Sequence, residues 1–304
     1  MKPVIGGQAV IEGVMMRSPG YYATAVRLEN GKIATEMHKI RKKPRWTQVP
    51  FLRGIINMFE MLIIGIKSLT WSADQFEEEP GKKLTGMQLF FTIAISLLFS
   101  LALFLVLPYF LTWLLGIDEE RQTILFNLVD GLIKIAILVL YLLIISSIKD
   151  IYRLFEYHGA EHKVVHCYES GKKLNVDNAK RFTRLHPRCG TSFLFIVLFI
   201  SIFVFAFTPG IMASLLPSFS SYPLLLRKTL LFAARLMLVP VVAGISYELL
   251  RLTAFHEKNK LLKAFAWPGL MLQYITTKEP NAKQIEVAIK AMDMVIRKDK
   301  LISK

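Results

Sequence analysis

The stretch "LFFTIAISLLFSLALFLVLPYFLTWLL", residues 89–115, lies inside a longer run, 84–117, that contains no charged side chain. A helix crosses the hydrocarbon core of a bilayer with about 20 apolar residues, so this run is long enough for one membrane span. Three further apolar runs follow, at 124–148, 192–216 and 224–250. The pattern predicts a mainly α-helical, polytopic membrane protein with four transmembrane helices.

Two of these runs carry charged residues. The second contains Asp130 and Lys134, and the fourth contains Arg235. An unpaired charge in lipid costs a few kcal/mol, and Asp130 and Arg235 lie at compatible depths, so we expect them to form an ion pair. An ion or proton relay through these residues, as in a transporter, is an alternative. The lack of an internal sequence repeat disfavours it.

The composition agrees with a membrane protein that has basic loops. The chain has 304 residues, of which 53% are hydrophobic, yet its formal net charge is +15. Nucleic-acid binding would also explain the charge, but the basic residues lie beside apolar runs and no recognition motif is present. We therefore expect no nucleic-acid partner. The expected partners are the anionic inner leaflet of the bilayer and other membrane proteins.

The distribution of Lys and Arg predicts the orientation in the cell membrane. Residues 1–86 contain thirteen of them, 149–190 contain nine and 251–304 contain eleven, whereas the other two loops contain only Arg121. Basic loops remain on the cytoplasmic side of a membrane. Both termini and the loop 149–190 should therefore be cytoplasmic, and the cysteines should be reduced thiols.

Three regions follow from these runs along the chain. Residues 1–85 form a cytoplasmic N-terminal region, 86–252 a four-span membrane domain, and 253–304 a cytoplasmic helical tail. Within the tail, Trp-Pro-Gly at 267–269 is expected to break the chain into two short segments. A closing amphipathic helix should begin near Asn281, a plausible helix cap.

The N-terminal region is expected to contain a small β-hairpin. Alternating residues flank Asn30-Gly31, a strong hairpin signal, and predict strands near 22–29 and 32–39. The mostly apolar segment 51–71 has a polar stripe at helical spacing, which predicts an amphipathic helix on the inner leaflet. A re-entrant span is the alternative, which three charged residues in the segment disfavour.

The stretch "EYHGAEHKVVHCYE", 156–169, holds the residues that are best suited to chemistry. His158, His162 and His166 recur at steps of four, with Glu161 among them, so a helix places the imidazoles on one face. H-x-x-E-H is the zinc motif of inverted zincins. We therefore predict that His158 and His162 bind a divalent metal and that Glu161 is the general base or a further ligand.

A second cluster, "RLHPRCGTSF" at 184–193, comes just before the third span and offers His186 and Cys189 at H-x-x-C spacing. Glu248 lies near the cytoplasmic end of the fourth span. We expect these side chains to join the site, with zinc as the metal for nitrogen and sulfur donors. A straight helix would hold His158 about 15 Å from the membrane surface, so the helix must bend or the loop must fold back.

Other interpretations of these residues stay open. A histidine on a partly buried helix face is more often a hydrogen-bonded core residue than a ligand. Glu161 could pair with Lys163, and neither His166 nor Cys167 is expected to be a required ligand. If the site is catalytic, hydrolysis of a peptide or lipid at the membrane surface fits best. A non-enzymatic scaffold with a structural metal is the alternative, and an open coordination position separates the two.

The stretch "GGQAVIEGVMMR" at 6–17 predicts a tight turn or a close approach of backbone to another element. Together with 157–169, 184–193, 242–250 and 267–280, it resembles the YqhQ-like family of bacterial multi-pass membrane proteins, described as predicted metal-dependent enzymes of unknown function. The resemblance implies a membrane protein and covers nearly the whole chain. It draws attention to a set of polar and glycine residues: Gly6, Gln8, Glu12, Arg17, His186, Cys189 and Gln273.

Overall fold

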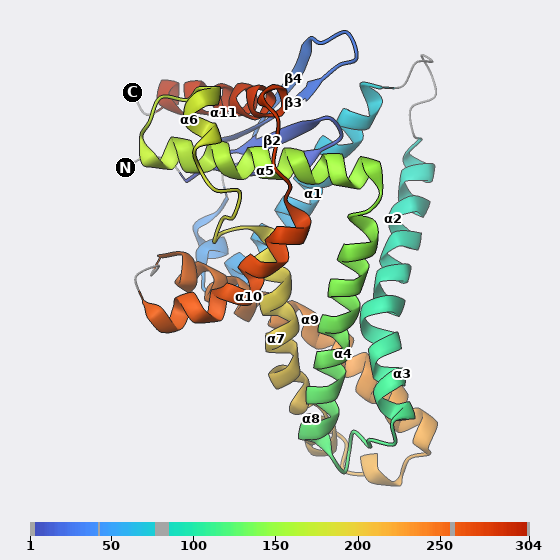
Figure 1. Ribbon diagram of the computed structural model, residues 1–304. Helices are drawn as coiled ribbons and strands as arrows, with labels where there is room; N and C mark the ends of the chain where they lie inside the picture. The colour runs from blue at the N-terminus through green and yellow to red at the C-terminus, as the bar shows by residue number, and fades with distance from the viewer. Residues whose placement is uncertain (1–3, 42, 77–84, 256–258, 303–304) are drawn as a thin grey trace.

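The computed structural model describes residues 4–41, 43–76, 85–255 and 259–302. Four long helices form a bundle, and a smaller layer of strands and helices covers one end of it (Figure 1). Both described ends of the chain lie beside this layer. The layer and the bundle meet where the candidate site residues are found.

Four helical segments are long and apolar enough to cross a membrane, as the four apolar runs predicted. In the first, a π-helical turn joins two α-helices, and in the third two helices follow each other closely. The elements that build the four spans are α2 (Gly86–Leu101), η2 (Ala102–Val106) and α3 (Leu107–Leu114); α4 (Thr123–Ile145); α7 (Gly190–Ala206) and α8 (Thr208–Leu215); and α9 (Leu224–Phe255), which the short turn η3 (Phe219–Ser221) precedes.

The charges within the spans pair with one another. Arg235 lies 3.5 Å from Asp130, which confirms the expected ion pair. Lys134 donates to the same carboxylate at 2.5 Å, and Arg235 also binds Glu119 at 2.9 Å. All four side chains are at most 3% exposed, so each charge is balanced by an opposite charge where water is excluded.

A four-stranded antiparallel sheet, rather than a single hairpin, forms the N-terminal region. The predicted hairpin is present as the last two strands, and the stretch at 6–17 forms another hairpin that turns at Glu12, whose φ is 52°. This first pair of strands contains few β-branched residues. The sequence therefore predicted the turn but not the strands on either side of it. The strands, in spatial order, are β1 (Gly6–Val10), β2 (Gly13–Arg17), β3 (Tyr21–Arg27) and β4 (Ile33–Lys39).

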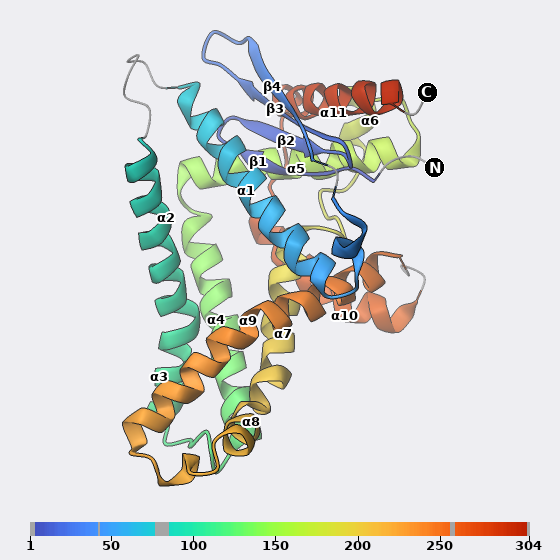
Figure 2. The same cartoon turned by 180° about the vertical axis from the view of Figure 1, so that it is seen from behind.

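Alternate residues of the sheet face two different helical layers. Ala23 and Ala25 belong to the core that the sheet shares with α5 (Lys149–Ser170) and α11 (Ala282–Ile302). The opposite face packs on α1 (Leu52–Asp74), which lies behind the strands in Figure 1 and in front of them in Figure 2. The N-terminal region, the loop between the second and third spans, and the tail therefore build one layer.

The chain turns sharply between α4 and α5, and this turn brings the histidines to the bundle. Residues 146–148 are non-helical, and α5 then runs across the end of the bundle rather than along its axis (Figure 1). Gly171, with φ of 79°, ends α5 in the left-handed conformation. The following segment, which contains α6 (Val176–Lys180), folds back to the start of α7. The chain therefore bends after α4 and folds back after α5, and either change of direction brings the histidines nearer to Cys189.

The tail differs from its prediction. One helix, α10 (Lys260–Thr276), continues through Trp-Pro-Gly, so the predicted break is wrong. Gly269 packs so closely on α7 that a Cβ there would lie 2.8 Å from the Cα of Ser192. Pro268 removes a hydrogen bond to the carbonyl of Ala264, which lies on the exposed side of the helix. Packing of the opposite side stabilises the helix across the proline.

Candidate metal centre

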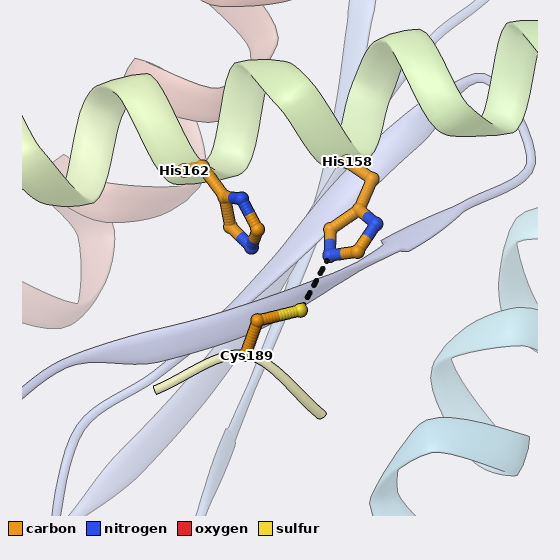
Figure 3. Close-up of side chains that lie close together, drawn as sticks. All are labelled: His158, His162 and Cys189. Atoms are coloured by element: carbon orange, nitrogen blue, oxygen red, sulfur yellow. Dashed lines mark hydrogen bonds between the residues drawn. The ribbon is translucent and has the colours of Figure 1, made fainter. Parts of the chain in front are cut away.

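Three ligand side chains converge where α5 passes over the first turn of α7 (Figure 3). His158 and His162 point from α5 toward Cys189, and one ligand atom of each residue lies within 4.8 Å of the other two. The Sγ atom of Cys189 is 3.3 Å from Nε2 of His158. Ligand atoms bound tetrahedrally to one zinc ion at about 2.0–2.3 Å lie about 3.3–3.8 Å apart, and the sulfur and Nε2 of His158 already have about this separation.

The remaining ring nitrogens of both histidines bond to backbone carbonyls. Nδ1 of His158 lies 2.8 Å from the carbonyl of Thr276, and Nδ1 of His162 lies 2.5 Å from that of Arg184. A carbonyl only accepts, so each Nδ1 carries the proton and each Nε2 keeps a lone pair in the neutral ring. This is the arrangement by which proteins orient histidines that bind metals.

Cys189 occupies the N-terminal cap of α7, immediately before the third span. Its sulfur lies 3.4 Å from the backbone nitrogen and 3.4 Å from the hydroxyl of Thr191. Free N–H groups and the helix dipole favour a negative charge at such a position. The first turn of the span therefore favours the thiolate form of this sulfur, which faces the two imidazoles.

The electrostatics of the cluster favour a positive charge between these atoms. Burial opposes the thiolate, but the charge and hydrogen bond of His158 lower the pKa of Cys189 well below its ordinary value, with further help from His162. Burial likewise disfavours an imidazolium, but Cys189 and then Glu161 raise the pKa of His158 to about 9. The negative charges that stabilise a proton on His158 would also stabilise a metal cation between Nε2 of His158 and Sγ of Cys189.

Glu161 lies beside the converging atoms and is 5% exposed. Its carboxylate is 3.4 Å from Nε2 of His162, the nitrogen that faces the cluster. The sheet makes room for it, because a Cβ at Gly7 would lie 3.0 Å from Cγ of Glu161. Lys163 pairs instead with Glu279 at 2.5 Å, so the ion pair considered for Glu161 and Lys163 does not form.

A second group, His166, Glu169 and His186, lies next along α5. Nδ1 of His186 accepts a hydrogen bond from the backbone N–H of Arg188, so its Nε2 carries the proton and faces Glu169 at 3.5 Å. The guanidinium of Arg188 also binds Glu169. These contacts form a network of hydrogen bonds and ion pairs beside the first cluster. In this network Arg188 already pairs with the carboxylate of Glu169.

The other two predicted ligands are placed differently. The rings of His186 and His162 are 5.6 Å apart, so His186 adjoins the cluster. Glu248 belongs to neither of the two ligand groups found in the described residues, so the structure does not bring it together with the other predicted ligands. Arg53, at the start of α1, binds the carboxylate of Glu248 through its Nε at 2.7 Å, and the N–H of Phe51 adds a bond at 3.2 Å.

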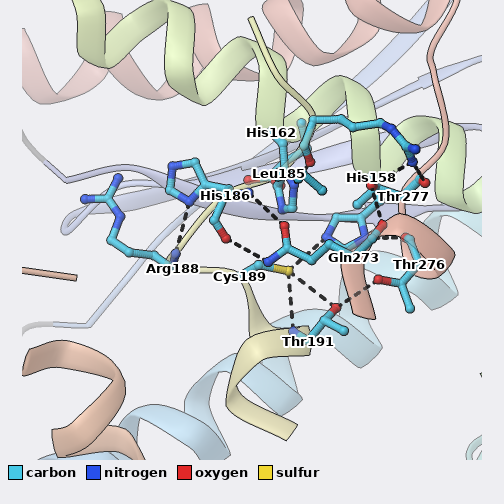
Figure 4. A network of polar contacts seen from close by, with 12 residues as sticks. His158, His162, Leu185, His186, Arg188, Cys189, Thr191, Gln273, Thr276 and Thr277 are labelled. Atoms are coloured by element: carbon cyan, nitrogen blue, oxygen red, sulfur yellow. Dashed lines mark hydrogen bonds and ion pairs between the residues drawn. The ribbon is translucent and has the colours of Figure 1, made fainter. Parts of the chain in front are cut away.

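The last turn of α10 supports the cluster from below (Figure 4). Gln273 is fully buried, accepts a hydrogen bond from the N–H of His186 at 2.7 Å and donates to its carbonyl at 2.8 Å. Arg184, whose carbonyl holds His162, donates to Thr277. Of these supporting residues only Gln273 was singled out from the sequence, although Arg184, Thr276 and Thr277 lie in the stretches 184–193 and 267–280.

The stretch at 6–17 also has a supporting role. Glu12, at the tip of the first hairpin, binds Arg153 and accepts from the hydroxyl of Tyr157, both on α5. Gln8 donates to the carbonyl of Gly65 on α1 at 3.2 Å. The hairpin thus connects α5 to α1 and fixes α5 over the bundle.

The fold and the cluster define a four-span membrane protein with a histidine–cysteine centre at one end of its bundle. The chain belongs to a family described as a protein of unknown function, DUF1385, whose model matches residues 49–298. It is similar to the uncharacterized protein YqhQ of Bacillus subtilis (strain 168), with 35% identity over 317 residues that cover 98% of this chain and 94% of that protein. No solved structure matches the chain.

Proposed function

We propose that this membrane protein binds a divalent metal ion, zinc in the first instance, through His158, His162 and Cys189. One observation carries the proposal: three nitrogen and sulfur donors converge while the far nitrogens of both imidazoles are held by carbonyls. Two imidazoles and a thiolate are ligands that zinc prefers. The two histidines come from α5 and the sulfur from the cap of α7, and the sulfur lies 3.3 Å from Nε2 of His158.

We further propose that the centre is hydrolytic. A zinc ion supplies a Lewis acid and lowers the pKa of a water molecule that it binds. In this role the carboxylate of Glu161, beside His162 Nε2, accepts the proton of the attacking water and later returns it to the leaving group. The carbonyls of Thr276 and Arg184 keep a proton on each Nδ1, and the metal would take the lone pair of each Nε2, so neither histidine would be available as the base.

The location of the cluster favours a membrane-associated substrate on the cytoplasmic side. Cys189 directly precedes the third span, so the centre lies at the level of the membrane boundary. The positive-inside distribution supports a cytoplasmic position for this end of the bundle. A reporter fused after residue 170 or after 304 should be cytoplasmic, and one placed within 117–122 should be external. An external reporter at 170 would contradict this orientation.

A scaffold with a structural metal is a second candidate, because the carboxylate of Glu161 lies 3.4 Å from one of the converging atoms, Nε2 of His162, and would be the fourth ligand in that role. Four protein ligands around zinc are typical of structural sites, whereas three with an exchangeable position are typical of catalytic ones. The residues of the centre and their hydrogen-bond partners come from α5, the start of α7 and α10, and this arrangement suits a catalytic or a structural metal.

Cobalt substitution tests the two roles. The visible spectrum of the cobalt-loaded protein should show thiolate coordination and should change when a small monodentate anion is added, because a catalytic centre has an open position. Glu161→Gln should keep the metal and the response to the anion. A spectrum that ignores the anion in the wild type and changes in Glu161→Gln would favour the structural role, and a lack of cobalt binding would exclude the metal centre.

A further inference from the structure

The outer side of α10 has a shallow, open hollow that the metal centre does not use. It has a volume of about 430 Å³ and is lined by Lys260, Lys263, Ala264 and Trp267. These positions recur at i, i+3, i+4 and i+7, so they share one face of the helix. Ala264 is the small residue between the long side chains, and its size leaves the hollow open.

The face combines unpaired positive charge with exposed apolar surface. Neither Lys260 nor Lys263 has an acidic partner within the ranges that the structure describes. Trp267 is 57% exposed and Leu261 is 81% exposed. Two cations beside an exposed indole are unusual on a surface that only water covers, but they suit the boundary between headgroups and acyl chains.

The position of α10 places this face at that boundary. The helix begins at Lys260, soon after the fourth span ends at Thr253. Its inner side packs along α7, with Gly269 against Ser192 and the ring of Phe265 5.2 Å from that of Phe199. Figures 1 and 2 show α10 projecting sideways from the bundle beside α7. The face therefore lies beside the spans and not above them in water.

We propose that this hollow binds the phosphate of an anionic phospholipid in the cytoplasmic leaflet. The ammonium groups of Lys260 and Lys263 would pair with the phosphate, while Trp267 and Leu261 lie against the glycerol and upper acyl region. Continuity with the fourth span favours a lipid over a soluble protein as the occupant. The proposal does not depend on the metal centre, because no residue of the hollow contacts it.

Native mass spectrometry of the delipidated full-length protein in detergent tests the proposal. Phosphatidylglycerol should bind the wild type more tightly than phosphatidylcholine does. Lys260→Gln/Lys263→Gln should weaken phosphatidylglycerol binding about 25-fold, since one basic residue near an anionic surface contributes about fivefold. Lys260→Arg/Lys263→Arg should retain binding, which shows that the charge is responsible and that the helix still folds.

Lys32→Gln/Lys39→Gln is the matched control, because it removes the same charge from exposed positions on the sheet. It should leave phosphatidylglycerol affinity unchanged. An equal loss in this control, or no loss in Lys260→Gln/Lys263→Gln, would overturn the site. Competition by millimolar glycerol 3-phosphate or inorganic phosphate would show that the hollow takes a soluble phosphate and would equally refute the lipid assignment. Zinc content should be the same in all these variants.

Discussion

The side chain of Gln273 should control both the stability of the protein and the affinity of its metal centre. Its amide forms two hydrogen bonds with the backbone of His186 and a third, at 3.0 Å, with the hydroxyl of Ser192. This clasp holds the turn between His186 and Cys189, and therefore the position of the sulfur. Gln273→Leu preserves the approximate volume of the side chain and removes every polar atom.

The size of the effect follows from the groups that lose their partner. Gln273→Leu leaves the N–H of His186 without a partner, whereas the carbonyl of His186 keeps its hydrogen bond from the N–H of Cys189 at 3.2 Å. A buried polar group left without a partner costs about 1–3 kcal/mol, so Gln273→Leu should lower the free energy of unfolding by about that amount. Removal of a supporting contact around metal ligands also typically weakens metal binding about 10–100-fold, and we expect a loss in that range.

Leu272→Ala separates the two effects. Leu272 precedes Gln273 on α10 and packs with Leu138 and Leu142, away from the clasp. Its truncation should destabilise the protein by about 2–5 kcal/mol but leave zinc affinity near that of the wild type. Thermal unfolding in detergent and zinc competition with a chromogenic chelator measure the two quantities. If Gln273→Leu binds zinc as tightly as Leu272→Ala does, the clasp does not position the centre and the reasoning fails.

Two further predictions concern buried charge. Asp130→Asn and Arg235→Gln should each lower stability by about 3–5 kcal/mol, and the double variant should lose less than their sum, because each single change leaves an unbalanced charge; additive losses in thermal unfolding would argue against the pair. Burial lowers the pKa of His166 to about 4 from an ordinary 6.5, with repulsion from His186 and His162 adding to the effect. Since the unfolded chain takes up this proton first, the contribution of His166 to the stability of the chelator-treated protein should be full above pH 6.5 and should be lost as the pH falls toward about 4. His166→Gln should flatten that part of a plot of melting temperature against pH, and an unchanged slope would contradict this assignment.

The spans and the histidine pair could be predicted from the sequence because both depend on local spacing. A charge-free run of this length has one stable arrangement in a membrane, and residues at steps of four share a helix face whatever lies around them. The approach of Cys189 was also predictable, since the residue ends a loop that begins with the helix of His158 and His162. A straight continuation of α4 would have carried His158 and His162 away from Cys189, so a shared site needed a change of direction. The sharp turn at residues 146–148 provides it.

Other features depend on contacts between distant segments and were missed for that reason. Glu248 had the chemistry of a ligand, but the carboxylate is taken by Arg53, which the fold of α1 against α9 brings to it. The carbonyls of Thr276 and Arg184 orient the histidines, and a carbonyl gives no sequence signal because every residue has one. The helix through Pro268 persists because tertiary packing outweighs a local breaker.

The metal content of the purified full-length protein tests the central claim most directly. Protein prepared in detergent without chelators should contain about one zinc ion per chain by inductively coupled plasma mass spectrometry. His158→Ala, His162→Ala and Cys189→Ser should each lose the ion, because each removes one of three converging donors. Glu248→Gln should keep it, since that carboxylate binds Arg53. A wild type without bound metal after zinc supplementation, or the same content in the three ligand variants as in Glu248→Gln, would contradict the account.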